Sequence, residues 1–593
     1  MANNNPDDHI KSVRHSLAHL LAATVTELYP GAKNSIGPAV ENGFYQDFET
    51  PNPISDEELP KIEAAMREKL KTWQNFTRKE VSPDEARKVF DWNPYKLELI
   101  DDFAKEDKQI TLYTSGTFVD LCRGGHVENA SEINPKAFKL TAVSGAYWRG
   151  DQTKQQLQRI YGVAFETEDE LKKYLQMMEE AKKRDHRKLG QELDLFVISD
   201  IVGSGLPLFT PRGTVLREEL GRYTQEIRSK RGFERVWTPN IAKTDLYKAS
   251  GHWDKFGDEL FLVKSQETND EFVLRPMNCP HHIQIYASQP RSYKQLPIKY
   301  MENAGDFRDE KTGELHGLSR VRSMTQDDSH AFVREDQIGQ VASEVVDAAQ
   351  EMYSQLDMKL KFRLSFRDDG DGYLGDMALW QRAQGMIEDL AKENKLDYFI
   401  AEGEAAFYGP KIDFMATDAL GREWQVATVQ IDFVLPQRFE LEYSTADGGV
   451  AQPVMVHCAL LGTIERFLSV YIEHTGGKFP IWNAPEQIRL ATVNQEYQTN
   501  EFADKILAQA KELGLRVNLD NSNESVGKKI RNAELMKVPF TVVIGEKEIE
   551  TGELMPRIRK DLEVNEKHEP HTVEEFLKSV ANDAKSRVSK TSL

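Results

Sequence analysis

Hydrophobic and polar positions alternate along this chain in segments whose period changes several times. Residues 321–333, VRSMTQDDSHAFV, alternate with a period of two, which predicts a β-strand. Apolar side chains recur at helical spacing over 464–472, which predicts an amphipathic helix. Short apolar runs at 488–493 and 539–544 alternate with helical patterns, which is typical of a small α/β unit.

Two breaks in this pattern divide the chain. Residues 166–192 are helical in period but charged on most faces, which predicts a solvated linker helix. At 475–485 two glycines end a helix and two prolines prevent its restart. We therefore predict an α+β domain over 1–165, a domain of long helices and alternating strands over 193–485, and a small α/β domain over 486–593.

The composition is that of a globular multidomain protein. The chain has 593 residues, of which 39% are hydrophobic and 29% charged, so a single module and a disordered chain are both excluded. Three cysteines cannot form a disulfide framework, which favours a reducing compartment. No apolar run approaches the roughly 18 residues of a membrane span, and the amino terminus has no signal-like core. We predict a cytoplasmic protein without membrane contact.

The formal net charge of −20 argues against a polyanionic partner only if the charge is spread evenly. The last 107 residues hold 17 Lys plus Arg and 18 Asp plus Glu, so the acidity lies before them. Two basic clusters occur in this part: Lys528, Lys529 and Arg531, and Arg557, Arg559 and Lys560. Charge alone favours a solvated helix and a charged tail; the alternative is a local contact with a nucleic acid.

The strand pattern at 321–333 places chemistry on one face of a sheet. Its alternate positions are Arg322, Met324, Gln326, Asp328 and His330. The preceding loop KTGELHGLSR predicts an antiparallel hairpin that brings Arg308 beside Arg322. Two guanidinium groups would suit a triphosphate, because each binds phosphate oxygens bidentately. The alternative is a surface strand with ordinary charges.

Two further segments carry candidate metal ligands. Cys279 lies in RPMNCPHHIQIY, and His457 lies in VMVHCALLGTIERFL, just before the predicted helix. Arg466 lies off the apolar stripe of that helix, so its charge faces either solvent or a cleft. Together RPMNCP, FRDEKTGELHGLSRVR, TQDDSH, FYGPKIDF, TVQIDF and VMVHCALLGTIERF resemble, in this order, the catalytic core of threonyl-tRNA synthetases, which are class II enzymes. PRGTVLREELGRYTQEIRSKRGFERVWTPNI resembles the class II dimer motif, which implies a homodimer.

The resemblance implies one Zn²⁺ per chain, held by Cys279, His330 and His457 with a fourth position open. L-threonine would bind there through its amino and hydroxyl groups, with Asp328 accepting a hydrogen bond and Met277 nearby. Valine lacks the hydroxyl and is expected to be rejected strongly. Serine lacks only a methyl group, worth about 1 kcal/mol, so rejection of serine is expected to fail.

The resemblance also implies binding of ATP with Mg²⁺, formation of threonyl-adenylate and transfer to tRNA(Thr). The nucleotide would be bound by Arg308, Glu310, Arg322, Thr428, Gln430 and Arg466. The catalytic residues would be Arg308, Gln326, Tyr408, Lys411 and Arg466. Where many relatives carry an arginine after the last zinc ligand, this chain has Cys458, which is predicted to place a second thiol beside the metal.

A second cluster lies near the amino terminus, where two pairs of ligands are each spaced four residues apart. This pattern resembles the zinc-binding editing domain of alanyl-tRNA synthetases and the metal-free editing domain of the threonyl type, which the surrounding sequence favours. A merely structural cluster is the third alternative. The resemblance implies hydrolysis of seryl-tRNA(Thr) by His15, His19, Lys96, Asp120, Cys122 and His126. Cys122 could be a nucleophile or a steric gate. Relatives often have proline in place of Gly125.

The last domain resembles the anticodon-binding domain of class IIa synthetases. Only 14 residues precede His15, so the ubiquitin-like domain of many bacterial relatives is expected to be absent. Alternatives are a silent RNA-binding or regulatory paralogue, a free-standing editing hydrolase, and a prolyl- or seryl-tRNA synthetase. A silent paralogue would be expected to lose Arg308, Arg466 or the zinc ligands, and an editing hydrolase would lack the middle domain. A prolyl- or seryl-tRNA synthetase would not need all three zinc ligands.

Overall fold

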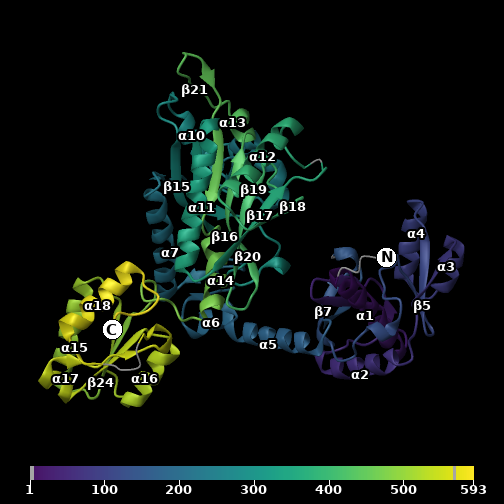
Figure 1. Cartoon of the computed structure of the whole chain (residues 1–593), viewed down its shortest axis with the longest axis horizontal. Helices are drawn as coiled ribbons and strands as arrows, with labels where there is room; N and C mark the ends of the chain where they lie inside the picture. The colour runs from purple at the N-terminus through teal and green to yellow at the C-terminus, as the bar shows by residue number, and fades with distance from the viewer. Residues whose placement is uncertain (1–5, 152, 371, 565–568) are drawn as a thin grey trace. The chain divides into compact units, whose positions relative to one another are not determined.

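The chain forms two compact units, one ending at Glu179 and one spanning Glu180–Leu593 (Figure 1). The computed structural model describes residues 6–151, 153–370, 372–564 and 569–593. Each unit has its own hydrophobic core. Within the described ranges, no helix combines the length and the apolar character that a membrane span requires.

The first unit is built around helix α1 (Pro6–Leu28). Leu17, Leu21 and Val25 are fully buried and lie four residues apart, so one side of α1 forms the core. The helix packs against α2 (Leu59–Leu70) and a sheet of order β1-β3-β8-β7 with β2 paired to β3. These strands are β1 (Lys33–Asn34), β2 (Ala39–Val40), β3 (Gly43–Glu49), β7 (Phe138–Tyr147) and β8 (Gln156–Ala164).

A second, smaller sheet in this unit has the order β4-β5-β6. Its elements are β4 (Thr77–Val81), β5 (Ile110–Ser115), β6 (Phe118–Leu121), and the helices α3 (Pro83–Val89) and α4 (Pro94–Lys105). All strand pairs of the two sheets are antiparallel, which confirms the predicted α+β class. The residues after β6 carry Cys122 and His126.

The second unit contains an eight-stranded sheet of order β11-β15-β16-β23-β20-β19-β17-β18, antiparallel except at its two edges. The strands are β11 (Glu234–Arg235), β15 (Ile298–Phe307), β16 (Ser323–Val333), β17 (Lys359–Phe366), β18 (Tyr398–Glu402), β19 (Lys411–Thr417), β20 (Glu423–Asp432) and β23 (Val454–Ala459). The predicted hairpin is confirmed, because Phe307 lies opposite Ser323 and the Arg308 amide donates to the Arg322 carbonyl at 3.0 Å.

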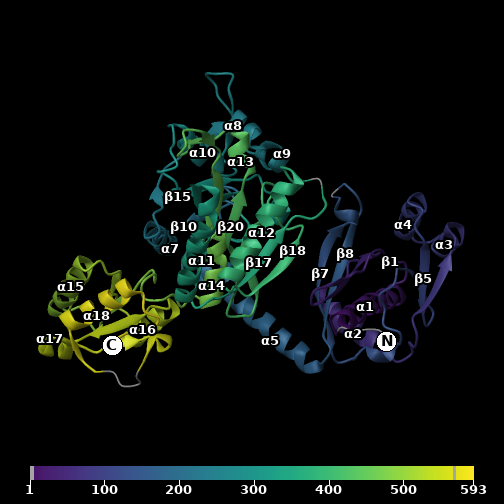
Figure 2. The same cartoon turned by 45° about the horizontal axis from the view of Figure 1, so that its top comes forward.

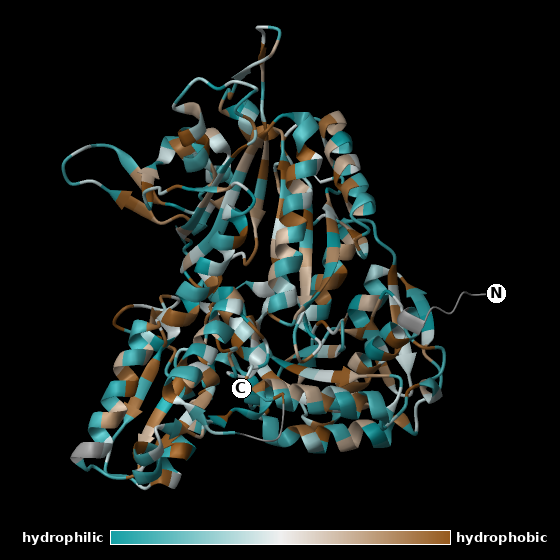
Figure 3. Ribbon diagram, turned by 60° about the vertical axis from the view of Figure 1, so that its left-hand side comes forward, coloured by the Kyte–Doolittle hydropathy of each residue, from teal (hydrophilic) through white to brown (hydrophobic). Residues whose placement is uncertain are grey.

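Long helices pack in one core with this sheet. They are α7 (Pro211–Ser229), α11 (Ile338–Gln355), α12 (Met377–Glu393) and α14 (Ile464–Thr475). Figure 2 shows α11 and α12 lying along the strands. In Figure 3 brown and teal positions alternate along the helices, as expected where one side of each helix is buried. The predicted helix at 464–472 is thus confirmed as α14.

The predicted single linker helix over 166–192 is wrong. The structure has two helices, α5 (Glu168–Arg184) and α6 (His186–Glu192), separated by Asp185. The Asp185 backbone is non-helical, and its carboxylate caps α6 by accepting from the Arg187 amide at 2.8 Å. His186 is buried and hydrogen-bonds to Glu473 at 2.8 Å, so α6 packs into the core of the second unit.

The carboxy-terminal part has the predicted small α/β fold. Its sheet has the order β25-β24-β26-β28, with β24 parallel to β25 and β26. The elements are β24 (Ile488–Thr492), β25 (Val517–Asp520), β26 (Phe540–Ile544), β28 (Arg557–Ile558), α15 (Tyr497–Glu512), α16 (Val526–Leu535) and α18 (Val573–Ser586).

Two members of the predicted basic clusters are not surface charges. Lys529 is buried and donates to the Thr492 carbonyl at 2.8 Å. Arg559 pairs with Asp561 at 2.8 Å and also donates to backbone carbonyls. Both side chains therefore stabilise the domain, and the basic patches available to a partner are smaller than the sequence predicts.

Candidate active site

One face of the eight-stranded sheet carries most of the predicted catalytic residues. His330 on β16 lies opposite His457 on β23, which in turn lies opposite Gln430 on β20. Gln430 is opposite Lys411 on β19. Because directly paired residues share a face and alternate residues return to it, Gln326, Asp328 and Thr428 lie on this face as well. The register thus confirms the prediction that alternate residues of 321–333 place their side chains on one face of a sheet.

The three predicted metal ligands come together on this face. Cys279, at the start of α10 (Cys279–Ala287), His330 and His457 are all buried, and one donor atom of each lies within 4.8 Å of the others. Burial raises the pKa of the Cys279 thiol well above its ordinary value and lowers the pKa of His330 well below. One sulfur and two imidazole nitrogens at this spacing fit the donor set of a zinc site with an open position.

Sequence reasoning missed the side chains that hold these ligands in place. Nδ1 of His330 lies 2.8 Å from Nδ1 of His282, and Nε2 of His457 lies 2.9 Å from a carboxylate oxygen of Asp432. Such outer partners fix the orientation of an imidazole ligand. His282 stands in the CPHH segment, so it could have been found there, but Asp432 could be assigned only from the strand register.

Cys458 does not lie beside the metal ligands, so the prediction of a competing thiol there is wrong. It follows His457 on β23, and successive side chains of a strand point to opposite faces. The Sγ atom lies 3.1 Å from the hydroxyl of Ser329, on the buried side of the sheet. The Cys458 thiol therefore packs in the core.

A cavity of about 350 Å³ is lined by Gln430, which lies opposite the ligand His457 on the neighbouring strand. Its lining includes the predicted residues Met277, Arg308, Gln326, Thr428, Gln430 and Arg466, and also Gln425 and Thr463, which sequence reasoning missed. A second cavity of about 530 Å³ shares Arg308 and Arg466 and adds Glu310. Within the described ranges, neither Arg308 nor Arg466 forms an ion pair with a carboxylate, and Glu310 pairs with Arg320 at 2.8 Å instead. Burial lowers the pKa of Arg466. Two unpaired guanidinium groups in one cavity suit an anionic ligand.

The other predicted residues contact, or are paired with, residues that line the two cavities. Arg322 donates to the backbone carbonyl of Glu310 at 3.0 Å and so braces the hairpin. Tyr408 donates to Gln430 at 2.6 Å, and its ring stacks on His457 with 4.8 Å between centroids. Lys411 lies 3.0 Å from the carboxylate of Asp413. The predicted site residues are thus brought together.

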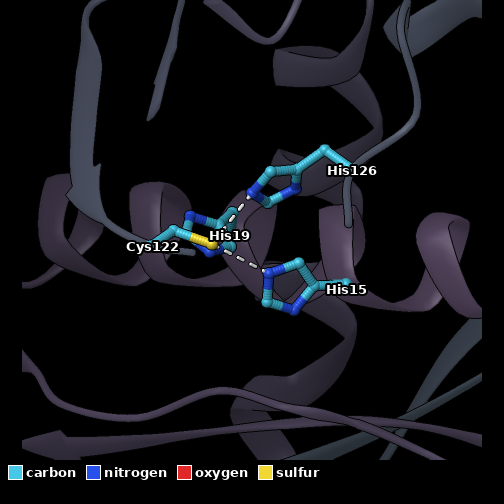
Figure 4. A group of neighbouring side chains, drawn as sticks. All are labelled: His15, His19, Cys122 and His126. Carbon is cyan, nitrogen blue, oxygen red and sulfur yellow. Dashed lines mark hydrogen bonds between the residues drawn. The ribbon is translucent and has the colours of Figure 1, made fainter. Parts of the chain in front are cut away.

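The amino-terminal cluster also comes together, as Figure 4 shows. His15 and His19 project from α1 toward Cys122 and His126, and one donor atom of each lies within 4.8 Å of the others. The Cys122 sulfur lies 3.0 Å from Nε2 of His15 and 3.3 Å from Nε2 of His126. Ser16 contacts the other nitrogen of His126 at 3.2 Å.

A buried ion pair supports this cluster. Lys96 and Asp120 lie 2.6 Å apart, and the same carboxylate is 3.5 Å from Nδ1 of His19. Asn34 donates to Asp120 at 3.1 Å and accepts from Asn93 at 2.8 Å through its carbonyl. Neither asparagine was expected from the sequence, because both lie outside the motifs that carry the resemblance.

Burial sets the protonation states of the amino-terminal cluster. It lowers the pKa of His15, lowers that of His19 well below its ordinary value and lowers that of His126 to about 2. It raises the pKa of Cys122 to about 11. At neutral pH the imidazoles are therefore uncharged and the thiol is protonated, which makes Cys122 a weak nucleophile.

An antiparallel sheet that carries a three-ligand site and two arginines in one cavity, followed by a small α/β domain, defines a class II tRNA synthetase. Residues 261–475 match the tRNA synthetase class II core domain (G, H, P, S and T), residues 487–582 the anticodon binding domain, and residues 110–161 the threonyl and alanyl tRNA synthetase second additional domain. The chain belongs to the threonine-tRNA ligase family, as its relatives show.

The threonine-tRNA ligase of Gloeobacter violaceus is 48% identical over 561 residues, covering 93% of this chain and 89% of the relative. That of Synechocystis sp. is 45% identical over 585 residues, covering 97% and 96%. A crystal structure titled as the RNA binding domain of threonyl-tRNA synthetase from Cryptosporidium parvum is 34% identical, with a TM-score of 0.64, and covers 69% of this chain and 99% of that one. A prolyl-tRNA synthetase from Giardia lamblia, 18% identical with a TM-score of 0.54, shares the fold.

Proposed function

We propose that this chain activates L-threonine with ATP and transfers the threonyl group to tRNA(Thr), while its first unit hydrolyses seryl-tRNA(Thr). The observation that carries the proposal is the meeting of Cys279, His330 and His457 beside a cavity with the unpaired side chains of Arg308 and Arg466. The boundaries at residues 165 and 485 remain part of this proposal, whereas α6, which ends at Glu192, belongs to the second unit. The cytoplasm is the compartment that we propose for it.

In the activation step, a carboxylate oxygen of threonine attacks the α-phosphorus of ATP, and the bond to the departing pyrophosphate breaks. Arg308 and Arg466 would neutralise the phosphate oxygens, together with the Mg²⁺ that accompanies ATP. Neither guanidinium has a carboxylate partner in the described ranges, so neither must break an ion pair to bind phosphate. The protein would contribute mainly position and charge.

Cys279, His330 and His457 would hold one zinc ion per chain. Bound zinc would supply a Lewis acid for the amino and hydroxyl groups of the amino acid. Asp328 lies on the same face, 3.6 Å from His330, and would accept the hydroxyl proton in a hydrogen bond. Valine would leave this buried carboxylate without a partner, whereas serine would satisfy it.

Pyrophosphate exchange with three amino acids tests the proposal. We expect threonine to be activated best, serine to be about 5- to 200-fold weaker because only a methyl contact is lost, and valine to be about 10⁴-fold weaker because a hydrogen bond is lost. Zinc is measured on the same samples. Equal activation of valine and serine would contradict the role given to Asp328, and no exchange at all would contradict the ligase.

We also propose a homodimer, because exposed apolar side chains lie in and near the predicted dimer motif. Ile201 is 99% exposed and Trp237 is 82% exposed, which is unusual for such large side chains in a monomer. We expect light scattering to give twice the mass of one chain for the wild type and one chain for the Ile201→Asp plus Trp237→Asp variant. Val450→Asp, an equally apolar position at 62% exposure outside the motif, should stay dimeric. A monomeric wild type would refute the dimer.

A further inference from the structure

Asp413 on β19 is fully buried in the second unit, yet its carboxylate is one of the most heavily hydrogen-bonded groups near the site. A carboxylate can only accept hydrogen bonds, so every group around it must point a hydrogen toward it. Its Oδ2 accepts from Arg363 at 2.9 Å, Ser365 at 2.7 Å and Lys411 at 3.0 Å. Its Oδ1 accepts from Gln425 at 2.7 Å and Thr428 at 3.1 Å.

The Thr428 contact begins a chain of hydrogen bonds whose direction is determined. A threonine hydroxyl has one hydrogen, which Asp413 takes, so Thr428 can only accept from Gln430. The Gln430 amide nitrogen donates to Thr428 at 3.3 Å, which turns the amide oxygen of Gln430 away from Thr428. That oxygen accepts from the Tyr408 hydroxyl at 2.6 Å. The direction of each hydrogen bond in this chain is therefore determined by the preceding one, beginning at Asp413.

Tyr408 ends the chain beside the metal-ligand triad. Its ring stacks on His457, with 4.8 Å between centroids. The Tyr408 hydroxyl lies 2.6 Å from the amide oxygen of Gln430, which can only accept, so the single hydrogen of the hydroxyl is used on Gln430. The Tyr408 oxygen therefore has only lone pairs left to offer to a ligand.

We propose that Asp413 is a positioning residue that sets the direction of the chain Asp413–Thr428–Gln430–Tyr408, so that Tyr408 offers only an acceptor and binds a donor group of the amino-acid substrate. This inference rests on the proposed ligase activity and adds Asp413, which is fully buried and does not line the cavity. The second carboxylate oxygen of Asp413 holds Arg363 and Lys411, but these contacts do not enter the chain.

The test is a set of double-mutant cycles on the full-length zinc-bound enzyme, with threonine-dependent pyrophosphate exchange as the readout. In Asp413→Asn, the amide can donate to Thr428, which allows the hydroxyl of Thr428, the amide of Gln430 and finally the hydroxyl of Tyr408 to reverse. In Thr428→Val, the chain is cut without a change of shape. We expect each to raise the KM for threonine about 10- to 100-fold, the usual loss for a hydrogen bond to a charged group.

Each substitution is then repeated in Tyr408→Phe, where the end of the chain is missing. If Asp413 acts through Tyr408, we expect neither Asp413→Asn nor Thr428→Val to raise the KM for threonine further by more than about twofold in this background. Direct loss of an ATP contact at Thr428 would instead appear in the KM for ATP, in both backgrounds alike. The KM values for ATP are therefore measured separately.

Ser365→Ala is the matched control. It removes a neutral, fully buried donor from the other oxygen of the same carboxylate, outside the chain. We expect a lower melting temperature and an unchanged KM for threonine. The inference would be overturned if Thr428→Val and Tyr408→Phe had fully additive effects on the KM for threonine. It would also be overturned if Ser365→Ala raised this KM as much as Thr428→Val does. If Asp413→Asn does not fold, the Thr428→Val cycle decides alone. A wild type without exchange would instead refute the ligase.

Discussion

Cys279→Ala and His330→Ala are each expected to reduce threonine-dependent pyrophosphate exchange by at least about 10³-fold and to lower bound zinc from about one per chain to almost none. Each removes one of three ligands, all buried, that lie within 4.8 Å of one another. A Lewis-acid contact is worth several kcal/mol, and each 1.36 kcal/mol is tenfold in rate. Metal content by mass spectrometry and exchange rates are measured on the same samples.

Cys458→Ala is the control for these variants. It removes a cysteine that is just as buried and lies next to a ligand in sequence, but on the opposite face of β23. We expect zinc content and exchange to be unchanged. Full exchange by metal-free protein, or loss of zinc in Cys458→Ala alone, would contradict the assignment of the triad.

The sequence was sufficient to predict site residues where these lie close together along the chain or within one motif. The period of two over 321–333 and the hairpin loop before it placed Gln326, Asp328 and His330 on one face, and the structure bears this out. The zinc ligands required more, because Cys279 and His457 lie on other segments. Only the order of the motifs, read as a resemblance, joined them.

The roles that could not be predicted from the sequence depend on strand register and on contacts with residues distant in the chain. Asp432 and Asp413 look like any acidic residues in a strand until the pairing of β19, β20 and β23 is known. Lys529 looked like a surface charge because its helix is polar, yet its stem is buried and its amine caps the carbonyl at the end of β24. Asp185 was hidden within a charged run, although aspartate is a preferred helix N-cap.

The amino-terminal cluster shows how burial narrows the chemistry that a motif leaves open. Cys122 was either a nucleophile or a gate on sequence grounds. Burial raises the pKa of its thiol to about 11, so the thiolate is scarce at neutral pH. We therefore propose that Cys122 shapes the pocket, and that the uncharged imidazoles of His15 and His19 orient water and the seryl ester.

His15→Ala plus His19→Ala is expected to slow the hydrolysis of seryl-tRNA(Thr) by at least about 100-fold, because positioned acid–base groups contribute 10² to 10⁴ in rate. Threonine charging should stay within about twofold, because the activation residues lie in the second unit. Serine misactivated at the triad would then accumulate on tRNA(Thr), which acid gels and labelled serine would detect.

His9→Ala is the matched control, because His9 lies on the same helix and pairs only with Glu132 and Glu166 among the described residues. It should hydrolyse seryl-tRNA(Thr) normally. Chelation separates the two readings of the cluster. If hydrolysis survives the removal of zinc, the result supports water oriented by the histidines and the Lys96–Asp120 pair. If hydrolysis is lost on chelation and restored by zinc, then His15, His19, Cys122 and His126 form a metal site. Unchanged serine mischarging in the double variant would remove editing from this unit altogether.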